Sequence, residues 1–192
     1  MASVCKAVER SHADLGVIFD TDVDRSAIIG LNGEPINRNS LIALISAVIL
    51  EEHPGSTVVT DSVTSDGLAE FIKEKGGKHH RFRRGYKNVI NEGIRLNEAG
   101  EECRLAIETS GHAALRENHF LDDGAYLAAK LIVYAAKLNK QGKQLHDIIS
   151  TLKQPKESKE IRIKLTEPDF KAYGAKVLED MKAKAAEVPG WT

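Results

Sequence analysis

Three aspartates stand at alternate positions in the segment GVIFDTDVDR, directly after an apolar run, and an arginine follows them. They are Asp20, Asp22 and Asp24, and the arginine is Arg25. Alternate side chains point the same way while a chain is extended, so the three carboxylates converge if the loop curls. Carboxylate oxygens suit hard cations such as Mg²⁺, and an arginine offsets the remaining negative charge and binds phosphate through two parallel hydrogen bonds. The segment therefore predicts a Mg²⁺ loop next to a phosphate.

Other interpretations of this loop are an acidic surface turn, a calcium loop and the centre of a phosphatase. The strict alternation after an apolar strand favours a metal over a surface turn in which Arg25 is only a local ion-pair partner. An EF-hand needs Gly at its sixth loop position and Glu at its twelfth, where this chain has Arg25 and Leu31. The loop also resembles that of haloacid-dehalogenase-type phosphatases, a resemblance that would make Asp20 a nucleophile and Thr60 its hydroxyl residue.

Short apolar runs alternate with helical patterns along the chain, and these elements must position the loop. Strands are expected at residues 15–19, 26–31, up to about 61, 78–82 and 103–107. Helices are expected from residue 39 onward and at 65–75, 86–99, 123–140 and 144–152. The alternation predicts an α/β fold, a three-layer α/β/α domain with a mainly parallel mixed sheet. Ligands of such sheets meet the loops after the strands, here DTDVDR, TDSVTS and ETSGH.

The composition divides the chain into three parts. Residues 33–153 are expected to form the α/β domain, with residues 1–32 and 154–192 as partial flanking domains. The charged segment KQPKESKE is typical of a linker, and a strand at 161–165 and a helix at about 168–186 are expected after it. One strand and one helix do not bury a core by themselves. The chain is therefore expected to be a fragment of a larger protein.

The overall charge gives little attraction to polyanions. Acidic and basic residues number 28 and 27, and the net charge is -1. We therefore expect neither a nucleic acid nor a membrane surface as a partner, and no apolar run approaches the length of a membrane span. The two cysteines are far apart and form no metal motif, which favours a cytoplasmic protein.

Four segments in order resemble the α-D-phosphohexomutase superfamily, which contains the phosphoglucomutases and phosphomannomutases. They are ADLGVIFDTDVDR, RGYKNV, ETSGHAALRENHFLDDGAYLAAKLI and EIRIKL…VPGWT. The resemblance implies phosphate transfer within hexose phosphates through a phosphoserine and a bisphosphate intermediate, with glucose or mannose as the sugar. It implies that the Mg²⁺ ligands are Asp20, Asp22 and Asp24, and that Arg25 lies beside the phosphate.

The same resemblance assigns the parts of the chain. It makes them the end of domain 2, domain 3 and the start of domain 4, and makes the remaining domains of the enzyme partners of this chain. The Thr-Ala-Ser-His-Asn-Pro type loop with the catalytic serine is absent from this sequence, so no catalytic residue is expected here and the chain alone is expected to be inactive.

The ETSGH loop (residues 108–112) is the expected sugar-recognition loop. The resemblance implies that Glu108 and Ser110 bind adjacent sugar hydroxyls, and both groups suit this role because a carboxylate accepts hydrogen bonds while a serine donates and accepts them. Gly111 would let the backbone approach the sugar, and His112 would line the pocket.

The basic segment at residues 78–87 suits the attraction of anionic sugar phosphates, although an exposed strand edge protected by charge explains it equally well. Arg83 is the best candidate within it, and Lys87 is expected to contact substrate phosphate. His79 and His80 are neighbours in a strand and face opposite sides, so they are given no shared metal.

Several polar residues near the ETSGH loop receive no catalytic role. Asp122 and Asp123 precede Gly124 and a long helix, a position that predicts helix caps. Glu117 and His119 are left without a role.

Overall fold

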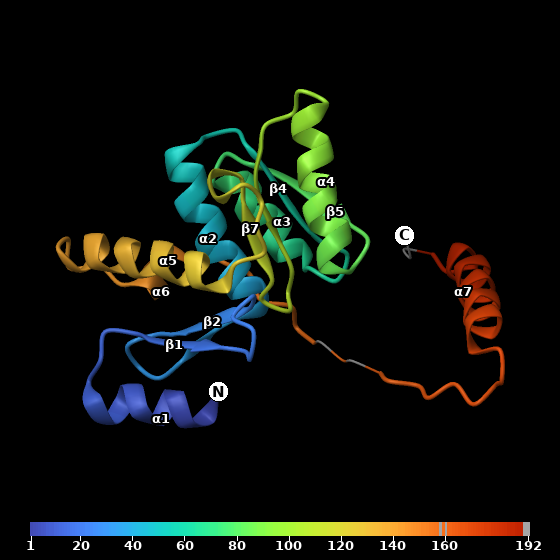
Figure 1. Ribbon diagram of the computed structural model, residues 1–192, viewed down its shortest axis with the longest axis horizontal. Helices are drawn as coiled ribbons and strands as arrows, with labels where there is room; N and C mark the ends of the chain where they lie inside the picture. The colour runs from blue at the N-terminus through green and yellow to red at the C-terminus, as the bar shows by residue number, and fades with distance from the viewer. Residues whose placement is uncertain (158, 160, 190–192) are drawn as a thin grey trace. The chain divides into compact units, whose positions relative to one another are not determined.

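The computed structural model describes residues 1–157, 159 and 161–189. The chain falls into two units, Met1–Lys156 and Glu157–Thr192, and the first unit contains two sheets (Figure 1). The smaller sheet comprises β1 (Gly16–Phe19), β2 (Ser26–Ile29) and β3 (Pro35–Ile36). The larger sheet comprises β4 (Thr57–Asp61), β5 (Lys78–Phe82), β6 (Cys103–Ile107) and β7 (Ala113–Leu115). The helices of this unit are α1 (Ala2–Ser11), α2 (Arg38–Glu52), α3 (Asp66–Glu74), α4 (Tyr86–Glu98), α5 (Gly124–Asn139) and α6 (Leu145–Ile148), with a 3₁₀ turn at Arg116–Asn118.

The larger sheet confirms the predicted fold class. Its strand order is β5-β4-β6-β7, in which β5, β4 and β6 are parallel and β7 is antiparallel to β6. Helices α2 and α3 cover one face and α4 covers the other. Side chains alternate between the two layers along β6, where Leu105 and Ile107 join the core under α2 while Ala106 joins the core under α4.

Helix α2 is the centre of this core. Every residue from Leu41 to Leu50 is buried, because the larger sheet, α3, α5 and α6 surround the helix. A helix that is apolar all round is stable only in such a position.

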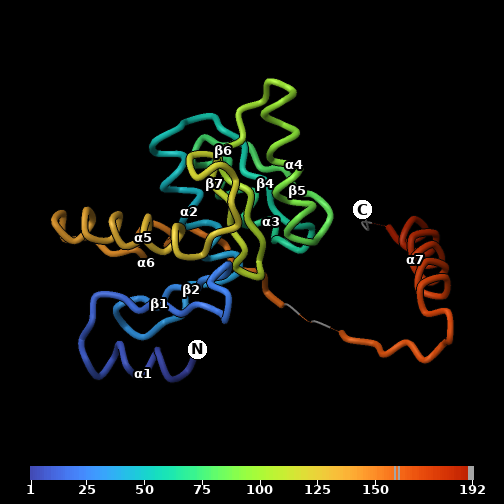
Figure 2. The backbone as a smooth tube through the Cα atoms, in the orientation of Figure 1, coloured from blue at the N-terminus to red at the C-terminus, as the bar shows by residue number. Residues whose placement is uncertain are grey.

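The smaller sheet is antiparallel, with the order β1-β2-β3, and lies between α1 and α5 (Figures 1 and 2). Helix α1 was not expected from the sequence. It lies directly on β1, since a Cβ on Gly16 would come within 2.6 Å of Val8 Cγ2. The segment DTDVDR is therefore the turn of a hairpin between β1 and β2, and the expectation that it follows a strand of the parallel sheet is wrong.

The second unit contains one helix, α7 (Phe170–Glu187), among its described residues. The side chain of Asp169 caps it by accepting a hydrogen bond from the Ala172 N–H at 3.1 Å. The strand expected at 161–165 is absent, because no described strand lies beside this segment to pair with its backbone. In the described part of the chain, no helix combines the length and apolarity needed to cross a bilayer.

Candidate functional site

The aspartate hairpin loop (residues 20–25) is tightly closed by its own arginine. Arg25 donates to both carboxylate oxygens of Asp20, from its backbone N–H to Oδ1 at 3.2 Å and from Nε to Oδ2 at 2.6 Å. Burial acts to raise the pKa of Asp20, but these hydrogen bonds outweigh it and hold that pKa below its usual value. Val23 has a φ of 63°, a left-handed conformation that is rare for a β-branched residue. The backbone strain and the ion pair together fix the shape of the loop.

The carboxylates of this loop fit a hard divalent cation. Oxygens of Asp20, Asp22 and Asp24 lie within 4.8 Å of one another. Asp24 Oδ1 is a buried atom with no hydrogen-bond partner among the described residues, and the nearest cationic atom is Arg25 Nε at 3.7 Å. A buried carboxylate oxygen without a partner is costly unless a cation binds it. These donors suit Mg²⁺, and the loop brings together the residues that were predicted as its ligands.

Backbone contacts dock the hairpin loop onto the larger sheet. Arg25 forms an isolated β-bridge with His112, and the Gly124 N–H donates to the Val23 carbonyl at 3.1 Å. A Cβ on Gly124 would lie 2.7 Å from the Arg25 carbonyl carbon, so only glycine permits this contact. Gly111, at a φ of +104°, is similarly tight, because a Cβ there would lie 3.0 Å from a carbonyl oxygen of β2.

The ETSGH loop is anchored on both sides. Buried Glu108 accepts the Gly85 N–H at 2.6 Å through one oxygen and the Ser110 hydroxyl at 3.1 Å through the other. Asp61, fully buried at the end of β4, accepts both the N–H and the hydroxyl of Thr109, at 3.3 and 2.7 Å. The loop is thus held in place before any ligand arrives, and Glu108 and Ser110 lie side by side.

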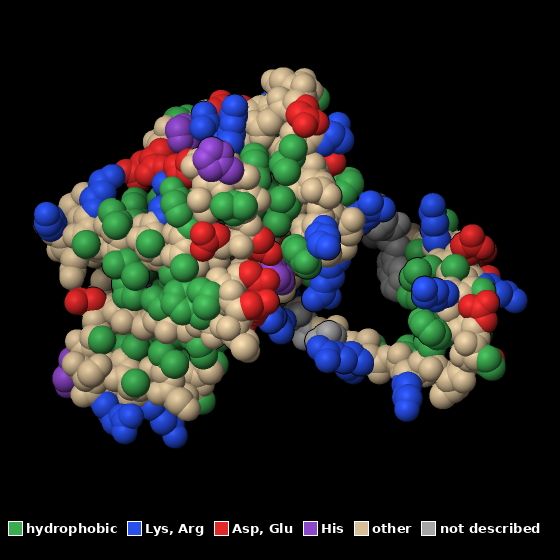
Figure 3. Space-filling view, in the orientation of Figure 1, with side chains coloured by type: hydrophobic (Ala, Val, Ile, Leu, Met, Phe, Trp, Pro, Cys, Tyr) green, Lys and Arg blue, Asp and Glu red, His purple; other side chains and the backbone are tan. Residues whose placement is uncertain are grey.

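A shallow, open cavity of about 200 Å³ lies where β1, β2 and the aspartate hairpin loop meet the ETSGH loop. It is lined by Ile18, Phe19, Asp20, Arg25, Ser26, Ala27 and Ser110. On the visible face of the molecule, acidic, basic and histidine side chains gather where the smaller sheet meets the larger one (Figure 3). The cavity combines a carboxylate, a guanidinium and a hydroxyl, which suits a small polar anion.

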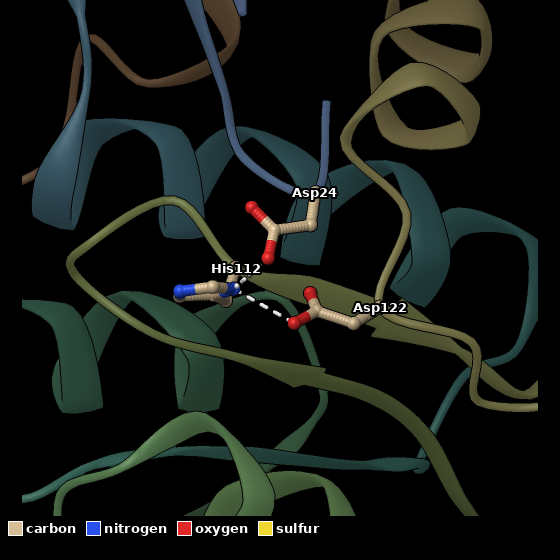
Figure 4. Close-up of side chains that lie close together, drawn as sticks. All are labelled: Asp24, His112 and Asp122. Atoms are coloured by element: carbon tan, nitrogen blue, oxygen red, sulfur yellow. Dashed lines mark hydrogen bonds and ion pairs between the residues drawn. The ribbon is translucent and has the colours of Figure 1, made fainter. Parts of the chain in front are cut away.

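His112 lies between two carboxylates from different parts of the chain. Its Nδ1 is 2.7 Å from Asp122 Oδ2 and 3.6 Å from Asp24 Oδ2 (Figure 4). Tyr86, the first residue of α4, stacks on the imidazole at 4.6 Å between centroids and 15° between planes. His112 therefore connects the aspartate hairpin loop, the larger sheet and the start of α4.

Only one of the two aspartates before α5 caps that helix. Asp123 accepts the Tyr126 N–H at 2.8 Å and is the cap. Asp122 instead bonds His112 and accepts the Ala113 N–H at 3.2 Å, so its interpretation as a cap is wrong. Burial raises the pKa of Asp122 above its usual value, although His112 opposes that shift. Asp122 is thus a part of the site that sequence reasoning missed.

The basic residues at the start of α4 lie over aromatic rings. The Lys87 ammonium is 5.9 Å from the centroid of Tyr86, the ring that stacks on His112. The Arg83 guanidinium is 5.8 Å from the centroid of Phe82. Lys87 is therefore connected to the site through one ring, and Arg83 lies at the end of β5.

His79 and His80 have separate partners, in agreement with their opposite directions in β5. His79 Nε2 lies 2.7 Å from Thr60 Oγ1, and His80 Nε2 lies 3.0 Å from a carboxylate oxygen of Glu92. Neither histidine belongs to a described cluster of possible metal ligands.

A second group of possible metal ligands lies on the surface, away from the two loops. Donor atoms of Glu52, His53 and Glu117 lie within 4.8 Å of one another. The Lys130 ammonium already contacts both carboxylates, at 2.8 and 2.9 Å, and supplies the positive charge there. His119 ends the 3₁₀ turn in a left-handed conformation, with a φ of 54°.

This geometry defines a class of protein: a three-layer α/β/α domain with an acidic, cation-suited hairpin docked against a polar loop. Residues 37–155 match the family described as phosphoglucomutase/phosphomannomutase, alpha/beta/alpha domain III. The chain belongs to this family.

Individual relatives agree with this assignment. The chain is 30% identical over 161 residues to a phosphomannomutase/phosphoglucomutase of Pseudomonas syringae pv. tomato, and the match covers 83% of the chain and 33% of the relative. It is 29% identical over 180 residues to a phosphoglucomutase of Neisseria gonorrhoeae, covering 93% and 36%. The crystal structure of a phosphoglucomutase/phosphomannomutase family protein from Burkholderia thailandensis superposes with a TM-score of 0.67 at 26% identity, over 79% of this chain and 31% of that one. The chain thus spans about a third of the length of these relatives.

Proposed function

We propose that this chain supplies the metal loop and the sugar-recognition loop of a phosphohexomutase. Such an enzyme moves phosphate between the 1- and 6-positions of a hexose through a phosphoserine and a bisphosphate. In this proposal residues 1–32 belong to domain 2, residues 33–153 form domain 3, and residues 154–192 begin domain 4. The family membership and the names of the relatives support this assignment.

Each predicted residue has a chemical role in the proposal. Mg²⁺ would be held by Asp20, Asp22 and Asp24, where it would neutralise charge on the phosphoserine that faces the loop. Arg25 would present its guanidinium to that phosphate, with Asp20 fixing its position.

The remaining predicted residues would bind the substrate. Glu108 would accept hydrogen bonds from sugar hydroxyls, and Ser110 would accept one while its own proton is donated to Glu108. Gly111 would keep the backbone close, and Arg83 and Lys87 would attract the distal phosphate. His112 would line the sugar pocket.

One observation carries the proposal. The aspartate hairpin loop is docked onto the ETSGH loop, so that Asp20, Arg25 and Ser110 line one cavity although about 90 residues of chain separate the hairpin from the serine. Such convergence brings a phosphate-binding guanidinium beside a sugar-binding hydroxyl, as a hexose phosphate requires.

Calorimetry with glucose 1-phosphate and mannose 1-phosphate tests the substrate class. Glu108→Ala should weaken binding by about tenfold or more, since it removes a charged hydrogen-bond acceptor, and Ser110→Ala by up to about tenfold, since it removes a neutral hydroxyl. Glu98→Ala, which removes an exposed carboxylate at the end of α4, should leave binding unchanged. Equal heats for the parent chain and both loop variants would contradict the proposal.

Thermal unfolding with and without Mg²⁺ tests the metal loop. Mg²⁺ should raise the unfolding temperature of the parent chain, because a ligand that binds only the folded state stabilises it. Asp24→Asn should abolish the increase, whereas Asp14→Asn, on the exposed α1–β1 connection, should retain it. An increase that persists in Asp24→Asn would place the ion elsewhere.

Activity assays separate the mutase from the phosphatase alternative. The chain alone should show neither glucose 1-phosphate isomerisation nor aryl phosphate hydrolysis. Mg²⁺-dependent hydrolysis that is lost in Asp20→Asn would favour the phosphatase.

A further inference from the structure

We propose that Asp122 is a positioning residue for His112, and that it fixes the imidazole in the tautomer with the proton on Nδ1. In this tautomer Nε2 carries a lone pair and accepts a hydrogen bond from a ligand hydroxyl. The ligand part of this inference rests on the proposed sugar pocket, whereas the positioning of the ring stands on contacts within the chain.

The first observation is the geometry of Asp122. Its Oδ2 lies 2.7 Å from His112 Nδ1, and its Oδ1 accepts the Ala113 N–H at 3.2 Å. A β-bridge between Ala114 and Asp122 holds the backbone at the same point. Both side chains are 15% exposed, so water competes little for this hydrogen bond. The carboxylate therefore has one arrangement, and it faces the ring.

The second observation is that an aromatic ring packs against the imidazole. Tyr86 stacks on one face of the imidazole, with 4.6 Å between the centroids. The backbone next to Tyr86 is held, because the Gly85 N–H donates to Glu108. The stacking favours one plane for the imidazole, and the hydrogen bond to Asp122 favours one rotation within that plane.

The third observation concerns the proton. An ionised carboxylate only accepts hydrogen bonds, so Nδ1 must donate, and a neutral imidazole then has no proton on Nε2. Asp24 Oδ2 lies 3.6 Å from the same Nδ1, on the same side of the ring. Nε2 points away from both carboxylates (Figure 4) and has no hydrogen-bond partner among the described residues. It is the one ring nitrogen available to a ligand.

Nitrogen-15 NMR of the imidazole tests the positioning directly in the ligand-free chain, above the pH at which histidines are protonated. The chemical shifts of the two ring nitrogens report which one carries the proton, and His112→Gln assigns the signals. We expect the Nδ1–H tautomer in the parent chain, a mixture of tautomers in Asp122→Ala, and the Nε2–H tautomer in Asp122→Asn, whose amide NH2 would donate to Nδ1 while its oxygen keeps the Ala113 N–H. The asparagine variant keeps the shape of the side chain and can still accept the Ala113 N–H, so it tests the inference even if the alanine variant unfolds.

Two further variants distinguish positioning from a general loss of structure. Asp122→Glu should restore the Nδ1–H tautomer at least in part. Asp123→Ala removes the adjacent carboxylate and the cap of α5, so it should lower stability while leaving the tautomer of His112 unchanged. An Nε2–H tautomer in the parent chain, or an unchanged tautomer in both Asp122→Ala and Asp122→Asn, would overturn the proposal.

Binding of hexose phosphates tests the ligand part separately. If Nε2 accepts a sugar hydroxyl, Asp122→Asn should weaken binding of glucose 1-phosphate by about tenfold at most, the value of one hydrogen bond. Unchanged affinity in Asp122→Asn would overturn the ligand part. A parent chain that shows the Nδ1–H tautomer but binds no hexose phosphate would refute the proposed function and leave the positioning role supported.

Discussion

The half-buried His79 of β5 should make the stability of the first unit depend on pH. His79 Nε2 lies 2.7 Å from Thr60 Oγ1, and the same hydroxyl is 3.1 Å from Thr64 Oγ1. Burial lowers the pKa of His79 from 6.5 to about 4, and the charges of Arg81 and His80 act in the same direction. His79 is therefore neutral in the folded chain near neutral pH, where it contacts the linked hydroxyl groups of Thr60 and Thr64.

The direction of the pH effect follows from the pKa values of His79 in the unfolded and the folded chain. Between pH 6.5 and pH 4 the unfolded chain binds a proton at His79 and the folded chain does not, so acid favours unfolding. The contribution of His79 is fully present above pH 6.5 and is lost as the pH falls toward 4. At about 1.4 kcal/mol per pH unit, the loss over this interval is about 3 kcal/mol, an upper value because the ring is only partly buried.

Urea unfolding at a series of pH values between about 7 and 4 measures this loss. His79→Gln keeps an amide near the position of Nε2 but does not titrate, so the free energy of unfolding should fall less steeply with acid in this variant. The carboxylates titrate in both proteins, and their effect cancels in the comparison. His146→Gln, which changes a histidine whose side chain is 63% exposed, should behave like the parent. Parallel pH profiles for the parent and His79→Gln would refute the reasoning.

Three other predictions concern packing and reactivity. Gly124→Ala should lower the free energy of unfolding in urea by about 1–3 kcal/mol, because the new Cβ would lie 2.7 Å from the Arg25 carbonyl carbon. A higher free energy of unfolding, as the helix propensity of alanine alone would give, would contradict this prediction. Phe71→Ala, at a side chain 1% exposed, should cost about 3–5 kcal/mol in the same assay. Burial raises the pKa of Cys103 to about 12. A thiol reagent should therefore modify Cys5 alone in the folded chain and both cysteines in denaturant. Rapid modification of two thiols in the folded chain would contradict this prediction.

The sequence pattern predicted the larger sheet well because helical segments that end at glycines precede its strands, with Gly76 and Gly77 before β5 and Gly100 before β6. The ranges expected for β5 and β6, Lys78–Phe82 and Cys103–Ile107, are those observed. Strand β7 was not predicted, since it has only three residues, Ala113–Leu115, and depends on pairing with β6 rather than on its own pattern. Helix α1 was also missed, although its polar and apolar residues segregate to opposite sides, and Val8 is its single buried residue.

The arrangement of the site was harder to predict than its residues. The spacing of the aspartates indicates that they converge, and their oxygens do lie within 4.8 Å of one another. Nothing in that spacing indicates that the hairpin belongs to a separate antiparallel sheet, or that Gly124 provides the surface on which it docks. A glycine at the start of a helix does not by itself indicate a contact with another segment, yet the absence of a Cβ on Gly124 allows the close contact with the backbone of Arg25.

A local rule does separate Asp122 from Asp123. Both precede a helix, and capping preferences alone assign them the same role. Asp122, however, pairs with Ala114 in an extended bridge, and neighbouring side chains in an extended segment point in opposite directions. One aspartate can therefore face the first turn of α5 while the other faces His112, as their hydrogen bonds show. The same alternation separated His79 from His80 at the level of sequence. For Asp122 and Asp123, the alternation implies that one of the two does not cap the helix. The partner of that aspartate is His112, in the loop ten residues earlier.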